Sequence, residues 1–165
     1  MRRKDREMPA EFARQVFDAC EYATISMIDA RNQPYALPVS IVRIGDNLYF
    51  HSALSGTKTD CLRLHPQVCV SAVSWTHLVP DQFTTEFSSA VCHGTASEVT
   101  DDTEKIAALR AICEKFAPTH MAAFDHAIAR SLSRTAIWKI SMDSITGKRK
   151  KYDSHGKELT FGRTE

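Results

Sequence analysis

Apolar and polar residues alternate with a period of two in several short runs of this chain. The runs that show this pattern are Ala23–Ile28, Val68–Val73, Phe87–Val99 and Ala136–Ser141. A period of two places every second side chain on one face of a β-strand. Gly45-Asp46 joins two further β-rich runs, 37–44 and 47–51, by a two-residue connection typical of antiparallel neighbours. The chain is therefore expected to build an antiparallel sheet.

Helical patterns occur at separate places and do not alternate with every strand. They are expected at 9–22, 58–64 and 121–129, and in a segment that begins at Asp101, which with Glu104 resembles a capping box. Residues 75–86 are predicted to form a long loop and 136–141 the last strand. This order favours an α+β antiparallel barrel over a parallel sheet.

The totals restrict the partners that the chain can have. Lys and Arg number 21 and Asp and Glu 20, so the overall charge gives no support for nucleic-acid binding. The only basic run, residues 148–151, is interpreted as a solvated strand end. No apolar run approaches the roughly 18 residues that a membrane span needs, and the first residues lack the apolar segment of a secretion signal. We expect a soluble, cytoplasmic protein without membrane contact.

The cysteines and histidines show no metal-ligand spacing. Five cysteines are spread widely, without a C-x-x-C pair, which argues against a disulfide framework and against a zinc site. They are expected to be buried, reduced thiols, and no metal is predicted.

The segment Tyr49–Lys58 carries the strongest chemical signal. It is a strand that runs into a loop rich in hydroxyl groups, with Gly56 and Lys58 near a helix start. Hydroxyls and free backbone N–H groups donate to phosphate oxygens, and a lysine supplies charge. By composition alone, an ordinary surface loop remains an alternative.

Three stretches together resemble a known signature. They are Pro34–Ser40, then Tyr49–Ala53 with Gly56 and Lys58, then His65–Cys69. In combination they are similar to the flavin-binding signature of the pyridoxamine 5′-phosphate oxidase-like split barrels, and within these to the nitroimidazole-resistance (Nim) proteins. The resemblance covers roughly residues 1–151. It implies a homodimer of six-stranded split β-barrels with flanking helices and FMN at the subunit interface. The polar tail, 152–165, carries little that could pack, and disorder is expected there.

The same resemblance assigns roles to individual residues. Lys58 and the loop of Ser52, Ala53, Ser55 and Gly56 match positions that hold the FMN phosphate. Pro38, Val39 and Ser40 match the strand whose backbone lies along the isoalloxazine ring. Independently of the resemblance, the missing backbone donor of Pro38 is compatible with a bulge there. Ser89 matches a contact from the partner subunit, and Lys148 or Arg149 falls near a basic position beside the flavin. His51 matches a histidine that, in nitroimidazole-reducing relatives, lies beside the cofactor in the substrate pocket.

Two interpretations of His51 stay open. An imidazole near neutral pH can donate a proton to a group that is being reduced, which is a catalytic role. Alternatively, His51 only hydrogen-bonds the ribityl chain or phosphate.

The resemblance implies an FMN-dependent oxidoreductase, a flavin reductase or nitroreductase, that passes electrons from NAD(P)H or another donor to a small organic acceptor. The alternatives are a flavin-binding or redox-sensing protein without turnover, and a split barrel that uses deazaflavin or haem. Vitamin B6 oxidation is disfavoured, because the carboxy-terminal arginine and histidine of the oxidases proper are not evident.

Overall fold

The computed structural model describes residues 2–161. The helices are α1 (Ala10–Ala19), α2 (Thr57–Leu64), α3 (Asp102–Phe116) and α4 (Phe124–Ser131), with short 3₁₀ turns at Lys4–Arg6, Pro80–Gln82, Pro118–Ala123 and Leu132–Arg134. The strands are β1 (Glu7–Met8), β2 (Ala23–Ile28), β3 (Pro34–Val39), β4 (Val42–Ile44), β5 (Asn47–Ser52), β6 (Gln67–Val79), β7 (Thr84–Glu98), β8 (Ala136–Ser141) and β9 (Ser144–Lys150). The α+β class is confirmed.

All strand pairings are antiparallel, as expected. The hydrogen-bonded order is β3-β2-β6-β7-β8-β5-β4, and β9 pairs with β7 and with β1. The described residues thus form a nine-stranded sheet instead of the expected six strands, and β3 and β4 do not pair to close it. Gly45 and Asp46 do join β4 to β5 as a two-residue hairpin, in which Gly45 has a φ of 60°.

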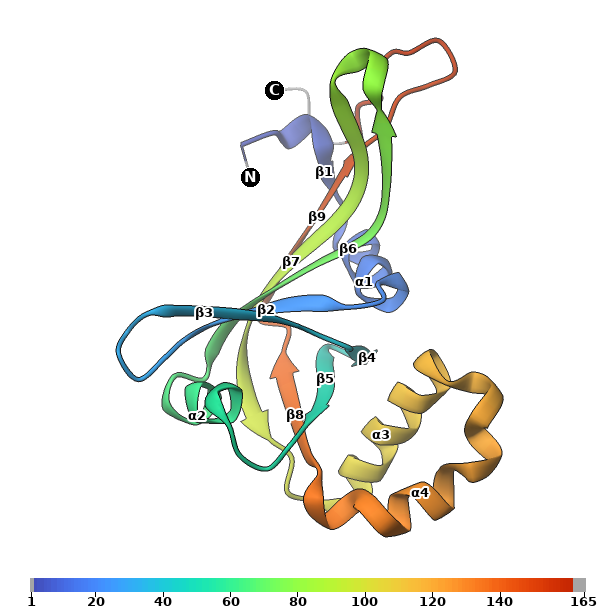
Figure 1. Ribbon diagram of the computed structural model, residues 1–165. Coiled ribbons are helices and arrows are strands. Elements are labelled where there is room, and N and C mark those ends of the chain that lie inside the picture. The colour runs from blue at the N-terminus through green and yellow to red at the C-terminus, as the bar shows by residue number, and fades with distance from the viewer. Residues whose placement is uncertain (1, 162–165) are drawn as a thin grey trace.

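Two strand assignments from the sequence were wrong. Residues 75–86 do not form a long loop, because β6 and β7 continue pairing to Val79 and Thr84 and make a long hairpin (Figure 1). The strand at 136–141 is not the last, because β9 follows it and pairs with β7 from Phe87 to His93. In both segments the backbone pairing across strands overrides a mixed, polar sequence pattern.

The prolines lie where a missing donor is tolerated. Pro34 begins β3, and Pro38 lies within β3, which pairs only with β2 and is therefore an edge strand. The register runs without interruption from Ile28–Pro34 to Ala23–Val39, so the bulge considered at Pro38 is absent. The free edge of β3 remains open for another partner.

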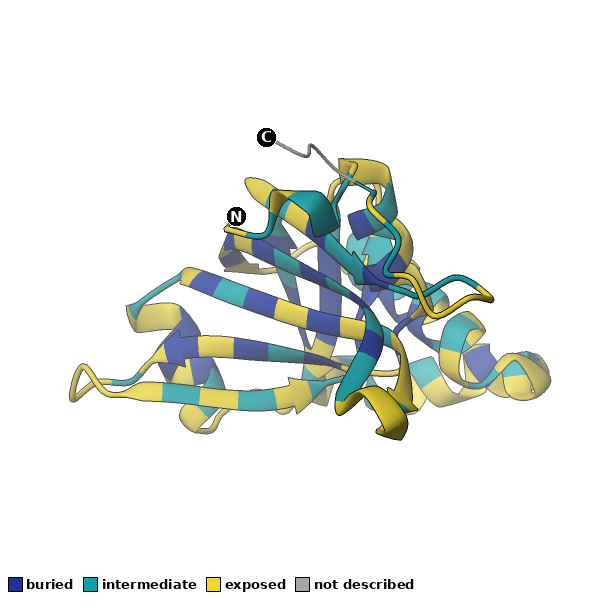
Figure 2. Cartoon of the chain, turned by 90° about the horizontal axis from the view of Figure 1, so that it is seen from above, coloured by how far each residue is buried: buried dark blue, intermediate teal, exposed yellow. Residues whose placement is uncertain are grey.

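Two apolar clusters lie on opposite sides of the sheet strands β5 and β8. The larger one contains α1 residues with the inward-facing residues of β2, β6 and β7, and it buries Phe17, Phe50 and Trp138. The smaller one places α3 and α4 against Tyr49 and Ile137. Buried and exposed residues alternate along the strands (Figure 2). This alternation means that neighbouring residues of β5 face different surroundings.

The carboxy-terminal residues 152–161 contact the amino terminus. Tyr152 forms a bridge with Glu158, and the Arg6 guanidinium lies 2.9 Å from a Glu158 carboxylate oxygen. Residues 162–165 lie outside the described residues, so the predicted domain boundary at residue 151 and the expected disorder of the tail stay predictions.

Membrane-spanning helices and groups of metal ligands are not found in the part of the chain that the structure describes. Within residues 2–161, no helix has the length and apolar character needed to cross a membrane, and no group of three or more potential ligands could hold a metal ion. The five cysteines are free; Cys20, Cys61 and Cys92 are buried, whereas Cys69 and Cys113 are partly exposed.

Candidate cofactor site

The loop after β5 forms one wall of a small pocket. Its volume is about 290 Å³, and Ser52, Ala53, Ser55, Gly56 and Lys58 line it, as do Thr57 and Thr59. Five residues expected to hold a phosphate are therefore gathered by one loop. Thr57 and Thr59 were not among the expected residues, although the run of hydroxyl-bearing side chains in the sequence contains both.

The first turn of α2 offers unpaired backbone donors to this pocket. Gly56 precedes the helix with a φ of 136°, a value that suits glycine, and no side chain caps the helix start. The Thr59 hydroxyl donates to the Gly56 carbonyl oxygen at 2.7 Å and does not use these N–H groups. Free N–H groups at a helix start favour an anion.

Lys58 supplies the positive charge. Its ammonium group lies 5.2 Å from the centre of the Phe50 ring, and burial lowers its pKa below the usual value of 10.5. Among the described residues, no carboxylate lies within ion-pair distance of this ammonium. A partly buried cation without a counter-ion is a costly arrangement that a bound anion would relieve. The pocket therefore fits a phosphate group.

The edge strand β3 also contributes to the lining of this pocket. Tyr35 and Leu37 line the pocket, whereas Pro38, Val39 and Ser40 do not. Val39 lies on the same face as Tyr35 and Leu37 and packs against the larger core, while Pro38 and Ser40 are exposed on the other face. Pro38, Val39 and Ser40 were expected along the isoalloxazine ring and not at the phosphate, so their role stays a prediction. Tyr35 and Leu37 were not among the expected residues, and the alternation of the strand is the signal that places these two side chains on one face.

His51 does not share this pocket with Ser52. It lines a second pocket of about 390 Å³, between β5 and the helical segment of α3, residues 118–123 and α4. Burial, and then the charge of Lys58, lower the pKa of His51 below its usual 6.5. The lowered pKa favours the neutral form of His51 near pH 7, although the residue as a whole is exposed to solvent.

Ser89, Lys148 and Arg149 line neither pocket. Ser89 of β7 is directly paired with Lys148 of β9, so these two side chains share the sheet face opposite to α1. Arg149 faces the other way, with its guanidinium 5.2 Å from the Phe161 ring centre and 6.0 Å from that of Phe12. Its Nε is buried and has no hydrogen-bond partner among residues 2–161. Within one chain, these three residues are not brought to the phosphate pocket.

The fold defines an α+β protein built on a large antiparallel sheet, and comparison with known proteins places it in a family. The model of the pyridoxamine 5′-phosphate oxidase family matches residues 10–149. This chain belongs to that family. A comparison with curated proteins found no match.

Solved structures share the fold. A putative 5-nitroimidazole antibiotic resistance protein from Bacteroides thetaiotaomicron is 22% identical, with a TM-score of 0.70 over 87% of this chain and 86% of that one. The flavocytochrome Anf3 from Azotobacter vinelandii is 21% identical, with a TM-score of 0.76 over 92% and 70% of the two chains. An FAD- and haem-binding protein from Mycobacterium smegmatis is 20% identical, with a TM-score of 0.73 over 88% and 73%. At these identities the likeness concerns the fold.

Proposed function

We propose that this protein is an FMN-dependent oxidoreductase that transfers electrons from NAD(P)H or another donor to a small organic acceptor. The observation that carries the proposal is the pocket in which Lys58, a partly buried cation without an ionic partner, faces hydroxyl groups and the uncapped start of α2. This arrangement suits the phosphate of FMN. When bound, the flavin ring would supply the redox chemistry.

The pocket volume of about 290 Å³ leaves room for a phosphate and part of the ribityl chain, but not for the whole cofactor. The ring would extend past Tyr35 and Leu37 along the open edge of β3. There the outer face of the ring would be exposed to water, and excluding water from a reactive cofactor prevents side reactions. A second subunit is the cover that we propose.

The sheet face opposite to α1 suits a homodimer interface. This face carries the small side chains of Ser71 and Val91, which pair with each other, and of Val73 and Ser89, which form the next pair on this face. Ser89 also pairs with Lys148 on its other side. No helix of the described chain covers this face, and 48% of Val73 is exposed. In such a dimer, Ser89 and Lys148 would contact the flavin of the partner subunit. Arg149 would not contact it, because its guanidinium packs against the rings of Phe12 and Phe161.

His51 has the properties of a group that assists reduction. The neutral imidazole can donate a hydrogen bond to an acceptor that gains negative charge, and its position beside Lys58 keeps it within the field of the phosphate pocket. In the alternative role, the same ring would hydrogen-bond only the cofactor.

Visible absorption of the purified protein tests the proposal. Oxidised-flavin bands are expected, and mass spectrometry of the released compound distinguishes FMN from FAD, deazaflavin or haem. A colourless protein that takes up no added FMN would contradict the proposal. Bound flavin that no pyridine nucleotide reduces, and that no nitro or quinone acceptor reoxidises faster than free FMN, would identify a flavin-binding protein without turnover.

A further inference from the structure

Two cationic side chains of α2 lie over one row of neighbouring residues in the sheet. In this row Phe50 of β5 pairs with Trp138 of β8, and Trp138 pairs with Glu98 of β7. The Lys58 ammonium is 5.2 Å from the Phe50 ring centre, and the Arg63 guanidinium is 5.8 Å from the Trp138 ring centre. The two cations differ in their partners, because only Arg63 reaches a carboxylate at the end of the row.

Arg63 joins this end of the sheet to the loop that lines the phosphate pocket. Its Nη2 atom donates to a Glu98 carboxylate oxygen at 2.8 Å and to the Leu54 carbonyl oxygen at 3.1 Å. The carboxylate of Asp60, one turn earlier on α2, is 4.0 Å from the same guanidinium. The Arg63 side chain is 44% exposed, and ion pairs at the surface contribute little to stability. What the bridge does fix is the position of the Leu54 carbonyl group.

The Leu54 carbonyl group and the Ser55 N–H group belong to one peptide unit. This peptide is trans, and a trans peptide is planar, with its C=O and N–H bonds pointing in opposite directions. Ser55 lines the phosphate pocket, whereas Leu54 does not. Among residues 2–161, no group accepts a hydrogen bond from the Ser55 N–H. Holding the Leu54 oxygen at Arg63 therefore also fixes the direction of a free donor at the pocket.

We infer that Arg63 is a positioning residue for the phosphate site: held by Glu98, it fixes the Leu54–Ser55 peptide so that the Ser55 N–H group donates to the bound phosphate. The identity of this phosphate as part of FMN rests on the proposed function, whereas the role of Arg63 toward a phosphate does not. Because Glu98 neutralises its charge, Arg63 acts through the loop and not as a second phosphate-binding cation.

Riboflavin has the ring and ribityl chain of FMN but no phosphate, so it separates a change in the loop from a general change in the fold. Arg63→Ala is expected to weaken FMN binding about tenfold, as for the loss of one hydrogen bond to a charged group, and riboflavin binding less than about twofold. Fluorescence titration of the full-length protein after removal of bound flavin measures both. Unchanged FMN affinity, or an equal loss for the two flavins, overturns the inference.

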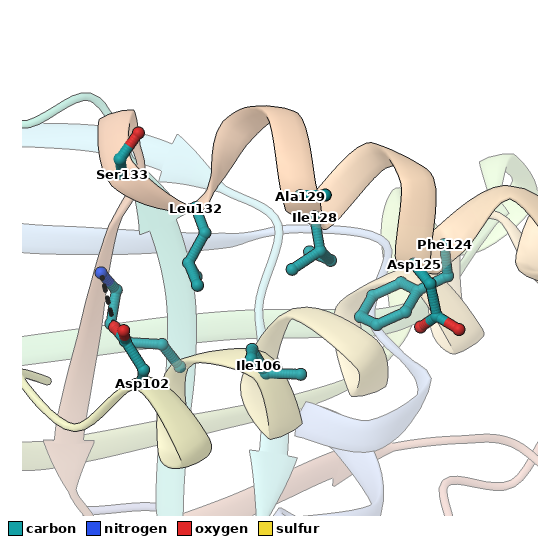
Figure 3. Close-up of a pocket in the computed structure, with 9 residues that line it drawn as sticks. Asp102, Ile106, Phe124, Asp125, Ile128, Ala129, Leu132 and Ser133 are labelled. Atoms are coloured by element: carbon teal, nitrogen blue, oxygen red, sulfur yellow. Dashed lines mark ion pairs between the residues drawn. The ribbon is translucent and has the colours of Figure 1, made fainter.

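Arg110→Ala is the matched control. The Arg110 side chain is 45% exposed, against 44% for Arg63, and it donates to Asp125 at 3.1 Å. Figure 3 shows Asp125 in a hollow between α3 and α4, which no described residue of α2 lines. Both flavin affinities should change less than about twofold in this variant. A loss of FMN affinity equal to that of Arg63→Ala would overturn the inference, because the effect would follow from removing any ion pair of similar exposure.

Glu98→Ala tests whether Glu98 and Arg63 act together. This variant should also weaken FMN binding, and the double variant Arg63→Ala/Glu98→Ala should bind FMN within about twofold of Arg63→Ala alone, because residues that act as one unit are not additive. Losses that multiply in the double variant would contradict the coupling that the inference requires.

Inorganic phosphate separates this inference from the proposed function. If the unmodified protein binds no FMN, the proposed function fails, and the amide NMR signal of Ser55 decides the inference; it also decides if riboflavin binds too weakly to compare. Phosphate is expected to shift this signal in the unmodified protein and in Arg110→Ala, but not in Arg63→Ala. No shift in the unmodified protein, or an equal shift in Arg63→Ala, overturns the inference. FMN that binds equally well to the unmodified protein and to Arg63→Ala refutes the inference alone.

Discussion

Gly94 of β7 lies directly against the backbone of Ser141 at the end of β8. A Cβ atom at position 94 would overlap the Ser141 carbonyl oxygen and lie 2.9 Å from its carbonyl carbon. At this point β7 changes partner, from β9 up to His93 to β8 from Ala96 onward. The missing side chain of Gly94 therefore allows one strand to connect the two parts of the sheet.

Substitution Gly94→Ala is expected to reduce the free energy of unfolding by about 3 kcal/mol or more, because the obstructing atoms belong to the backbone and cannot rotate away. Gly147→Ala is the control: its nearest neighbour would be the Phe12 ring edge at 3.0 Å, part of a side chain that can move. Urea unfolding of both variants measures the difference. A Gly94→Ala protein as stable as Gly147→Ala would contradict the close approach.

Glu104 links α3 to the sheet, and its ionisation makes the stability of the fold depend on pH in the acidic range. Its carboxylate accepts hydrogen bonds from Lys139 at 2.9 Å and from the Tyr49 hydroxyl at 2.8 Å, and these hold the pKa of Glu104 below its usual 4.5. A lowered folded-state pKa contributes stability above pH 4.5, which is lost as the pH falls through the folded-state value.

Glu104→Gln should therefore lower stability at pH 7 and reduce the loss of stability on acidification. The control is Glu114→Gln, an exposed position on the same helix. Unfolding midpoints measured from pH 3 to pH 7, described by linkage, give the comparison. Parallel pH profiles for Glu104→Gln and the unmodified protein would show that the link does not titrate as described.

Lys58→Ala should weaken FMN binding by about one to two orders of magnitude, which corresponds to a charge-assisted hydrogen bond of roughly 1.5–3 kcal/mol. Lys105→Ala is the control and should leave FMN affinity unchanged, because Lys105 lines a separate hollow between α3 and α4. Titration of FMN by fluorescence quenching measures both. Unchanged affinity in Lys58→Ala would show that the loop is wrongly assigned.

His51→Ala should reduce turnover with an organic acceptor more than it reduces FMN affinity, since His51 lines the second pocket, between β5, α3 and α4, and not the phosphate pocket. His126→Ala, on the exposed side of α4, is the control. Turnover and flavin affinity are measured on the same preparations. A variant that loses affinity for FMN but keeps turnover per bound flavin would support the purely cofactor-binding role.

Val73→Asp should convert the proposed dimer to a monomer, because it places a charge on the uncovered sheet face opposite Ser89. Ile44→Asp replaces an apolar residue of similar exposure, 40% against 48%, on β4 and away from this face. Sedimentation of the two variants and the unmodified protein checks the mass. If the unmodified protein is a monomer, the proposal that a second subunit covers the flavin is contradicted.

Local patterns in the sequence predicted much of the architecture. Patterns formed by residues close in sequence predicted three features: the alternation of buried and exposed residues in β2, the hairpin at Gly45-Asp46 and the start of α3. Asp101 does cap α3, accepting from the Glu104 N–H at 2.7 Å. The Glu104 side chain, however, turns to Tyr49 and Lys139 instead of completing the capping box, because a partner distant in sequence competes for it.

The sequence by itself determined several of the antiparallel strands, such as β2 and β8, and the loop that carries the hydroxyls and Lys58. Side-chain period and turn chemistry act locally, which is why these features could be predicted. Only the tertiary structure decided that 75–86 extends a hairpin, that β9 adds to β7, and that Ser52 and His51 line different pockets. These outcomes depend on which strands and helices lie next to each backbone segment. Such neighbours come from distant parts of the chain, and the local pattern of residues does not identify them.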